Sequence, residues 1–75
     1  MEQMQLPEIG SVWTHDKTGN LYTVEMISNV GTTKPDDFPV TVIYRSFETD
    51  DLWSRPVAEW HRSMSINKHL GRRHD

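Results

Sequence analysis

The sequence predicts a mostly β fold: a small barrel of four to five antiparallel strands with a short C-terminal helix. Three observations support this prediction. Short segments rich in β-branched and aromatic residues alternate in polarity, turn-forming residues separate them, and an apolar stripe with helical spacing follows the last segment. A chain of 75 residues suffices for a single domain, which we place at residues 7–64, followed by a flexible basic tail at residues 65–75.

The first two strands are expected at residues 10–15 and 21–27. The segment between them, residues 16–20, contains Gly19 and Asn20, which tolerate the backbone of a tight reversal. In the second strand, alternation places one uniformly apolar face toward the core. Its members are Tyr22, Val24 and Met26.

The strongest strand signal covers residues 40–47, after a proline-containing loop at residues 29–39. Both faces of this strand are partly apolar, as expected for a strand that curls through a barrel. One face carries Val40, Val42 and Tyr44, and the other carries Ile43 and Phe47.

An acidic turn at residues 48–51 leads into a short fourth strand at residues 52–54. Pro56 is expected to end that strand and to begin a helix, because proline cannot donate to a ladder but suits a first helical turn. The apolar stripe of this helix consists of Val57, Trp60 and Met64.

Several short motifs occur in a fixed order: Gly10, Trp13-Thr14-His15, Gly19-Asn20-Leu21-Tyr22-Thr23-Val24, Val42-Ile43-Tyr44 and Leu52-Trp53-Ser54-Arg55-Pro56. This order resembles a small bacterial and phage domain family of unknown function. The resemblance covers roughly residues 9–64 and implies a compact, SH3-like barrel with no established activity. The chain departs from the family pattern at the inserted Thr18. It also lacks the glutamate-bearing segment before the third strand and has a loop rich in Pro and Asp instead.

Composition and charge exclude several classes of protein. The chain has no cysteine, so it can form neither disulfides nor thiolate metal sites. No apolar run approaches the length of a membrane span, and the N-terminal residues do not resemble a signal peptide, so we expect a cytoplasmic protein with no membrane partner. A net charge of −3 gives no general attraction to nucleic acid.

The histidines do not indicate catalysis or metal binding. His15 beside Asp16 could act as a base, but no nucleophile motif accompanies it, and a structural or binding role is favoured. The other three, His61, His69 and His74, lack the separation of three or four residues that places two ligands on one helical face. We therefore expect no enzymatic activity, no metal and no cofactor.

Trp53 and Arg55 share one face of the fourth strand. In one interpretation Trp53 closes the end of the barrel as a core residue, and Arg55 pairs with an acid such as Glu25, Asp50 or Glu59. In the other, Trp53 is exposed and stacks with Arg55 as a binding platform.

These residues suggest a non-enzymatic interaction module that binds a protein partner at one end of the barrel. One alternative is a site for a small anionic ligand or nucleotide, with the pocket between two copies of a homodimer. A lower-ranked alternative is nucleic-acid binding through the tail residues Lys68, Arg72 and Arg73. The predicted binding surface, named here the aromatic rim, consists of Trp13, His15, Asn20, Tyr22, Tyr44, Trp53 and Arg55.

Overall fold

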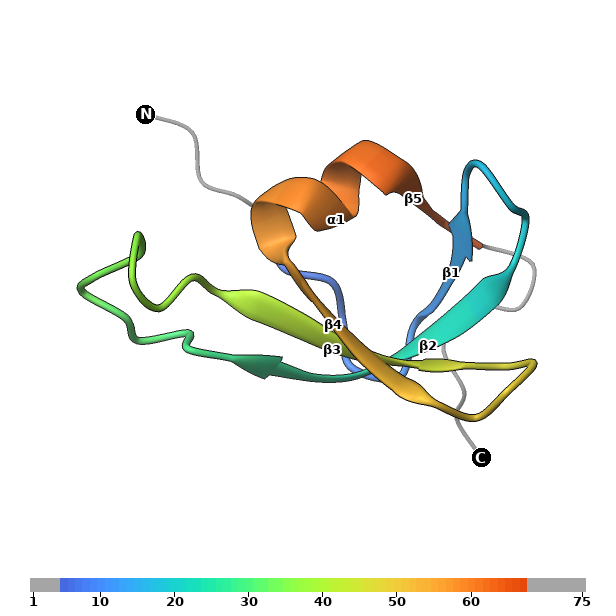
Figure 1. Cartoon of the computed structure of the whole chain (residues 1–75), viewed down its shortest axis with the longest axis horizontal. Coiled ribbons are helices and arrows are strands. Elements are labelled where there is room, and N and C mark those ends of the chain that lie inside the picture. The colour runs from blue at the N-terminus through green and yellow to red at the C-terminus, as the bar shows by residue number, and fades with distance from the viewer. Residues whose placement is uncertain (1–4, 68–75) are drawn as a thin grey trace.

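The computed structural model describes residues 5–67 and contains five strands and one helix (Figure 1). In chain order, the elements are β1 (Val12–His15), β2 (Leu21–Ser28), β3 (Thr41–Ser46), β4 (Leu52–Pro56), α1 (Val57–Ser63) and β5 (Met64–Ile66). The fold is therefore mostly β, with one short helix near its C-terminal end, as the sequence predicts.

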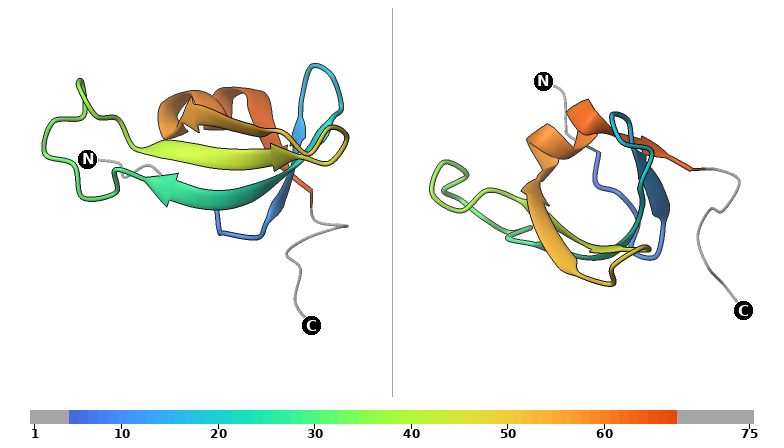
Figure 2. Two further views of the ribbon diagram at one scale, coloured as in Figure 1. Left: turned by 60° about the horizontal axis from the view of Figure 1, so that its bottom comes forward. Right: turned by 45° about the vertical axis from the view of Figure 1, so that its right-hand side comes forward.

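The five strands form a single antiparallel sheet in the order β4-β3-β2-β1-β5. The sheet is open, because β4 and β5 are its two edges and do not pair with each other within the described part of the chain. Helix α1 connects these edges, and Figure 2 shows it crossing the gap between them above a strongly curved sheet. The described residues thus form a curved, open sheet with a helix across its opening, and strand pairing does not close it into a barrel.

Positive backbone φ angles occur in the connections between the strands. Gly19 has a φ of 78° in the β1–β2 turn, where its N–H donates to the carbonyl of His15 at 2.7 Å. Asn29 has a φ of 63°, and its side-chain amide donates to the Pro39 carbonyl at 2.9 Å, which ties together the base of the long β2–β3 loop. These are residue types that adopt the left-handed region at low cost.

Aromatic rings in edge-to-face contact form much of the core. Trp60 of α1 is fully buried, with its ring centroid 5.4 Å from that of Trp13 and 4.8 Å from that of Tyr44. The ring of Tyr44 in turn meets that of Tyr22 at 5.2 Å. Such contacts add about 0.5–1.5 kcal/mol each to the effect of burial itself. The buried cluster consists of Trp13, Val24, Val42, Tyr44, Val57, Trp60 and Met64.

The predicted core face of β2 is wrong at one residue. Met26 is 54% exposed, whereas Val24 is 1% exposed. The register between β2 and β3 shifts between Val24 and Met26, because Glu25 is an extra, unpaired residue. A bulge of one residue reverses the alternation, so Ile27 packs against the core in place of Met26.

Two predicted boundaries also differ from the structure. Strand β4 continues through Pro56, which pairs with Thr41 on the edge of the sheet, where a missing N–H is tolerated. Met64 is buried as expected, but it begins β5, and pairing with β1 continues through Ile66, past the predicted domain end at residue 64. The rest of the predicted tail, residues 68–75, lies outside the described residues.

Candidate binding cleft

Five of the seven rim residues lie around one cleft of about 240 Å³. They come from four strands: His15 from β1, Tyr22 from β2, Tyr44 from β3, and Trp53 and Arg55 from β4. Thr18, from the β1–β2 turn, completes the lining. Below, "the cleft" refers to these six residues: His15, Thr18, Tyr22, Tyr44, Trp53 and Arg55.

Strand register brings these side chains to one face of the sheet. Tyr44 pairs directly with Trp53 across β3 and β4, and residues that face each other in an antiparallel pair point to the same side. Alternation then places Arg55 on the same face as Trp53. On β2, Val24 pairs with Tyr44 and therefore points to the same face. Tyr22 is two residues before Val24, so it shares that face.

The two β4 residues differ in their surroundings. Trp53 is 54% exposed, which favours the platform interpretation over the core plug. Arg55 is half-buried; its Nε–H donates to the Tyr44 hydroxyl at 3.3 Å and its Nη1 to Ser63 Oγ at 2.6 Å. The Ser63 hydroxyl itself donates to the Glu59 carbonyl at 3.2 Å, which directs its lone pairs toward Arg55.

The expected acid partners of Arg55 are not beside it. Glu25 and Asp50 instead pair with Arg45, at 3.3 Å and 3.8 Å, on the opposite face of β3. Within residues 5–67, no carboxylate lies at ion-pair distance from Arg55. Among the described residues, the hydrogen-bond partners of the Arg55 guanidinium are therefore two neutral hydroxyl groups, and no carboxylate pairs with it.

His15 is oriented by the turn that follows it. The backbone N–H of Thr18 donates to His15 Nδ1 at 3.3 Å. A backbone amide can only donate, so Nδ1 is the acceptor and the neutral imidazole carries its proton on Nε2. Gly19 and Asn20 close this turn through backbone hydrogen bonds to the His15 main chain, at 2.7 and 2.9 Å.

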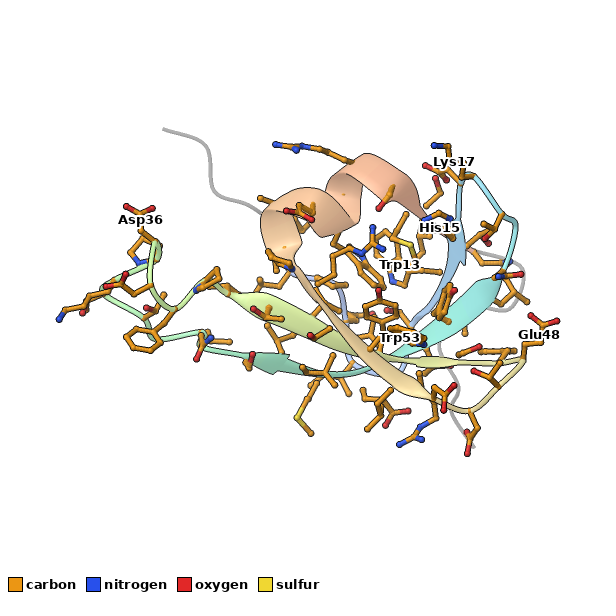
Figure 3. All side chains as sticks on the ribbon, viewed as in Figure 1. Trp13, His15, Lys17, Asp36, Glu48 and Trp53 are labelled. Carbon is orange, nitrogen blue, oxygen red and sulfur yellow. The ribbon has the colours of Figure 1, made fainter. Side chains whose placement is uncertain are left out.

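The structure does not bring Trp13 and Asn20 to the cleft. Trp13 is 9% exposed in the core, and its indole N–H donates to Ser11 Oγ at 2.8 Å. Asn20 is exposed in the β1–β2 connection, where its N–H donates to Thr18 Oγ1 at 3.2 Å. Figure 3 shows Trp13 below α1, between β4 and β1 in this view, and His15 at the end of β1.

A second hollow of about 560 Å³, named here the side cavity, adjoins the cleft. It lies between the β1–β2 turn and the end of α1, and His15 lines both hollows. None of its other members is predicted from the sequence as a binding residue, because only the tertiary fold brings the turn beside the helix. These members are Asp16, Lys17, Arg62 and Ser63.

The described part of the chain holds no group of three or more His, Asp or Glu side chains that could bind a metal ion. Among residues 5–67, no helix has the length and apolar character needed to cross a bilayer. The histidines His69 and His74 and the basic residues Lys68, Arg72 and Arg73, considered above for metal or nucleic-acid binding, lie outside the described residues.

We compared the chain with known proteins by sequence and by fold. No family model, curated protein or solved structure matches it significantly.

Proposed function

We propose that the chain is a non-enzymatic interaction module that binds a protein partner through the cleft. The observation that carries this proposal is the convergence of five rim residues from four strands around one hollow, with a 54% exposed tryptophan among them. Trp, Tyr and Arg are the residue types that most often carry binding energy at protein interfaces. All three types line this cleft.

The division of roles follows from burial and hydrogen bonding. Trp53 offers apolar area that a partner side chain can cover, with little loss of conformational freedom because its ring is rigid. Arg55 has five N–H donors, of which Tyr44 and Ser63 occupy two, so the remaining donors can orient a polar group of the partner. His15, with its proton on Nε2, supplies a further donor.

We also propose that the fold is an SH3-like barrel with an incomplete wall and that the chain belongs to the bacterial and phage family that its motifs resemble. The seven-residue helix α1 joins the two edge strands β4 and β5, which supports the barrel because a sheet closes into a barrel when its two edges are brought together. The cleft unites His15 with Tyr22, Tyr44, Trp53 and Arg55, all of which stand within the motifs of that resemblance. We propose a cytoplasmic location.

The test is affinity capture from a lysate of the host cell with the wild-type chain and matched variants. We expect Trp53→Ala and Arg55→Ala to lose the captured partner. Phe47→Ala and Arg45→Ala are the controls, because Phe47 is 52% exposed and both residues lie outside the cleft. If the partner is retained by folded Trp53→Ala and Arg55→Ala, or is lost equally with the controls, the cleft is not the binding site.

A second candidate function is the binding of a small anionic ligand or nucleotide, with a second copy of the chain completing the pocket. The concave shape of the site favours it, since small-molecule sites are concave and lined by aromatic side chains with a few polar groups. Titration with a nucleotide panel, followed by tryptophan fluorescence, tests this candidate. A response would be expected from Trp53, and no response from any nucleotide would exclude nucleotides as ligands.

A further inference from the structure

Positive charge gathers around the cleft and the side cavity, although the net charge of the chain is −3. Residues 5–67 contain five Lys and Arg side chains, and three of them, Lys17, Arg55 and Arg62, line one of the two hollows. Among the described residues, Asp16 is the only acid that lines either. With neutral histidine, the formal charge around the two hollows is 3 − 1 = +2.

The two hollows share a wall. His15 lines both of them. Arg55, which lines the cleft, donates from Nη1 to Ser63 Oγ of the side cavity at 2.6 Å. The cleft and the side cavity are therefore adjacent, with His15 and the Arg55–Ser63 hydrogen bond at their boundary.

Neighbouring carboxylates do little to neutralise these cations. In the described part of the chain, neither Arg55, Lys17 nor Arg62 has a carboxylate within ion-pair distance. Asp16 accepts a hydrogen bond from Ser65 Oγ at 2.6 Å, which holds its carboxylate toward β5. Arg45 illustrates the contrast, because Glu25 and Asp50 both pair with it.

We infer that the cleft and side cavity together bind a phosphate monoester whose molecule also carries an aromatic ring, with the ring against Trp53 and the phosphate near Arg55. This inference rests on the proposed function and specifies the chemistry of its ligand. A phosphate monoester carries a charge of about −1.5 to −2 near neutral pH, which complements the +2 around the hollows. Arginine also binds phosphate oxygens through paired N–H groups.

A phosphate of this kind could come from a phosphorylated tyrosine of a protein partner or from a free nucleotide. Both are phosphate monoesters that also carry a planar aromatic ring; a single oxygen joins ring and phosphorus in phosphotyrosine, and the ribose separates them in AMP. The side chains of the cleft recognise the shared chemistry, and titration with O-phosphotyrosine and with AMP separates the two sources. Tighter binding of O-phosphotyrosine would assign the site to a protein partner, and tighter binding of AMP would assign it to a nucleotide.

The primary experiment titrates phenyl phosphate into the ¹⁵N-labelled full chain and follows the Trp53 indole N–H and the Arg55 Nε–H by NMR. Phenol and inorganic phosphate are the matched control probes, because phenol has the aromatic ring without the phosphate and inorganic phosphate has the anion without the ring. We expect phenyl phosphate to bind at least about tenfold more tightly than either probe and to shift both signals. Equal binding of phenyl phosphate and phenol would overturn the inference.

Matched variants locate the phosphate. Arg55→Gln should weaken phenyl phosphate binding by about tenfold or more, Arg62→Gln by less, and Arg45→Gln by less than about twofold. Arg55→Lys keeps the charge, so it serves as the second variant if Arg55→Gln does not fold. Equal effects of Arg55→Gln and Arg45→Gln would place the anion elsewhere and overturn the inference.

The capture experiment distinguishes failure of this inference from failure of the proposed function. If phenyl phosphate does not bind but partner capture still depends on Trp53, the ligand chemistry is wrong and the interaction module stands. If phenyl phosphate binds at Arg55 but capture does not depend on Trp53, the phosphate site stands and the protein-binding function is wrong.

Discussion

Tyr44 and Trp53 are direct partners across β3 and β4, yet Tyr44 is 5% exposed and Trp53 is 54% exposed. Tyr44 lies one strand inside the sheet, with the rings of Trp60 and Tyr22 against it. Trp53 lies on an edge strand, with a paired strand on one side only. The pair thus joins the aromatic core to an accessible aromatic surface, and Arg55, two residues after Trp53, donates to the Tyr44 hydroxyl.

Trp60 in α1 and Trp53 in β4 should differ strongly in how much each contributes to the stability of the fold. Trp60→Ala is expected to lower the free energy of unfolding by about 3–5 kcal/mol, because its ring is fully buried and contacts two other aromatic rings. Trp53→Ala is expected to lower it by about 1 kcal/mol, because more than half of its surface is in water. Urea denaturation followed by circular dichroism measures both, and similar losses would contradict the assigned burial.

Quenching of tryptophan fluorescence by acrylamide should report mainly on Trp53. Trp13 is 9% exposed and Trp60 is 0% exposed, so a water-borne quencher reaches neither ring readily. Trp53→Phe should therefore remove most of the quenchable emission and shift the remaining spectrum to shorter wavelength. Unchanged quenching in this variant would mean that another tryptophan is accessible.

Alanine substitutions at two glycines should have opposite effects. Gly19→Ala is expected to destabilise the fold by about 1–2 kcal/mol, because a φ of 78° is unfavourable for a residue with a Cβ. Gly31 is not in that region and a Cβ there has no atom within 4 Å, so Gly31→Ala should be neutral or stabilise by about 0.4–1 kcal/mol. Thermal denaturation of the two variants tests this, and equal shifts would argue against the β1–β2 turn described here.

Ser63 and Arg55 should be energetically coupled. Ser63→Ala removes the acceptor of the 2.6 Å bond from Arg55 Nη1, and we expect a loss of about 1 kcal/mol. A double-mutant cycle with Arg55→Ala should give a coupling energy of about 0.5–1.5 kcal/mol. A parallel cycle of Ser63→Ala with Arg45→Ala is the control and should give no coupling, since Arg45 bonds to Glu25 and Asp50. Additive losses in the first cycle would show that the bond contributes nothing.

Much of the fold was predictable because local signals agree with it. The β-branched and aromatic segments, the turn residues and the stripe of Val57, Trp60 and Met64 all correspond to observed strands, turns and buried positions. Met26 could not be placed, because nothing in the sequence around Glu25 indicates a bulge, and one extra residue moves every later side chain to the other face. Strand β5 was missed because three residues carry too little pattern to indicate a strand before its partner is known.

The sequence by itself determined the mostly β class, the order of the first four strands and the helix, and the aromatic and basic residue types that gather at the cleft. Only the tertiary structure decided which of these side chains meet. It buries Trp13 in the core and leaves Trp53 exposed on an edge strand. It also pairs Arg45, and not Arg55, with Glu25 and Asp50. The physical reason is that burial and charge pairing depend on strand register and on α1 crossing an open sheet, and these are contacts between residues distant in the chain.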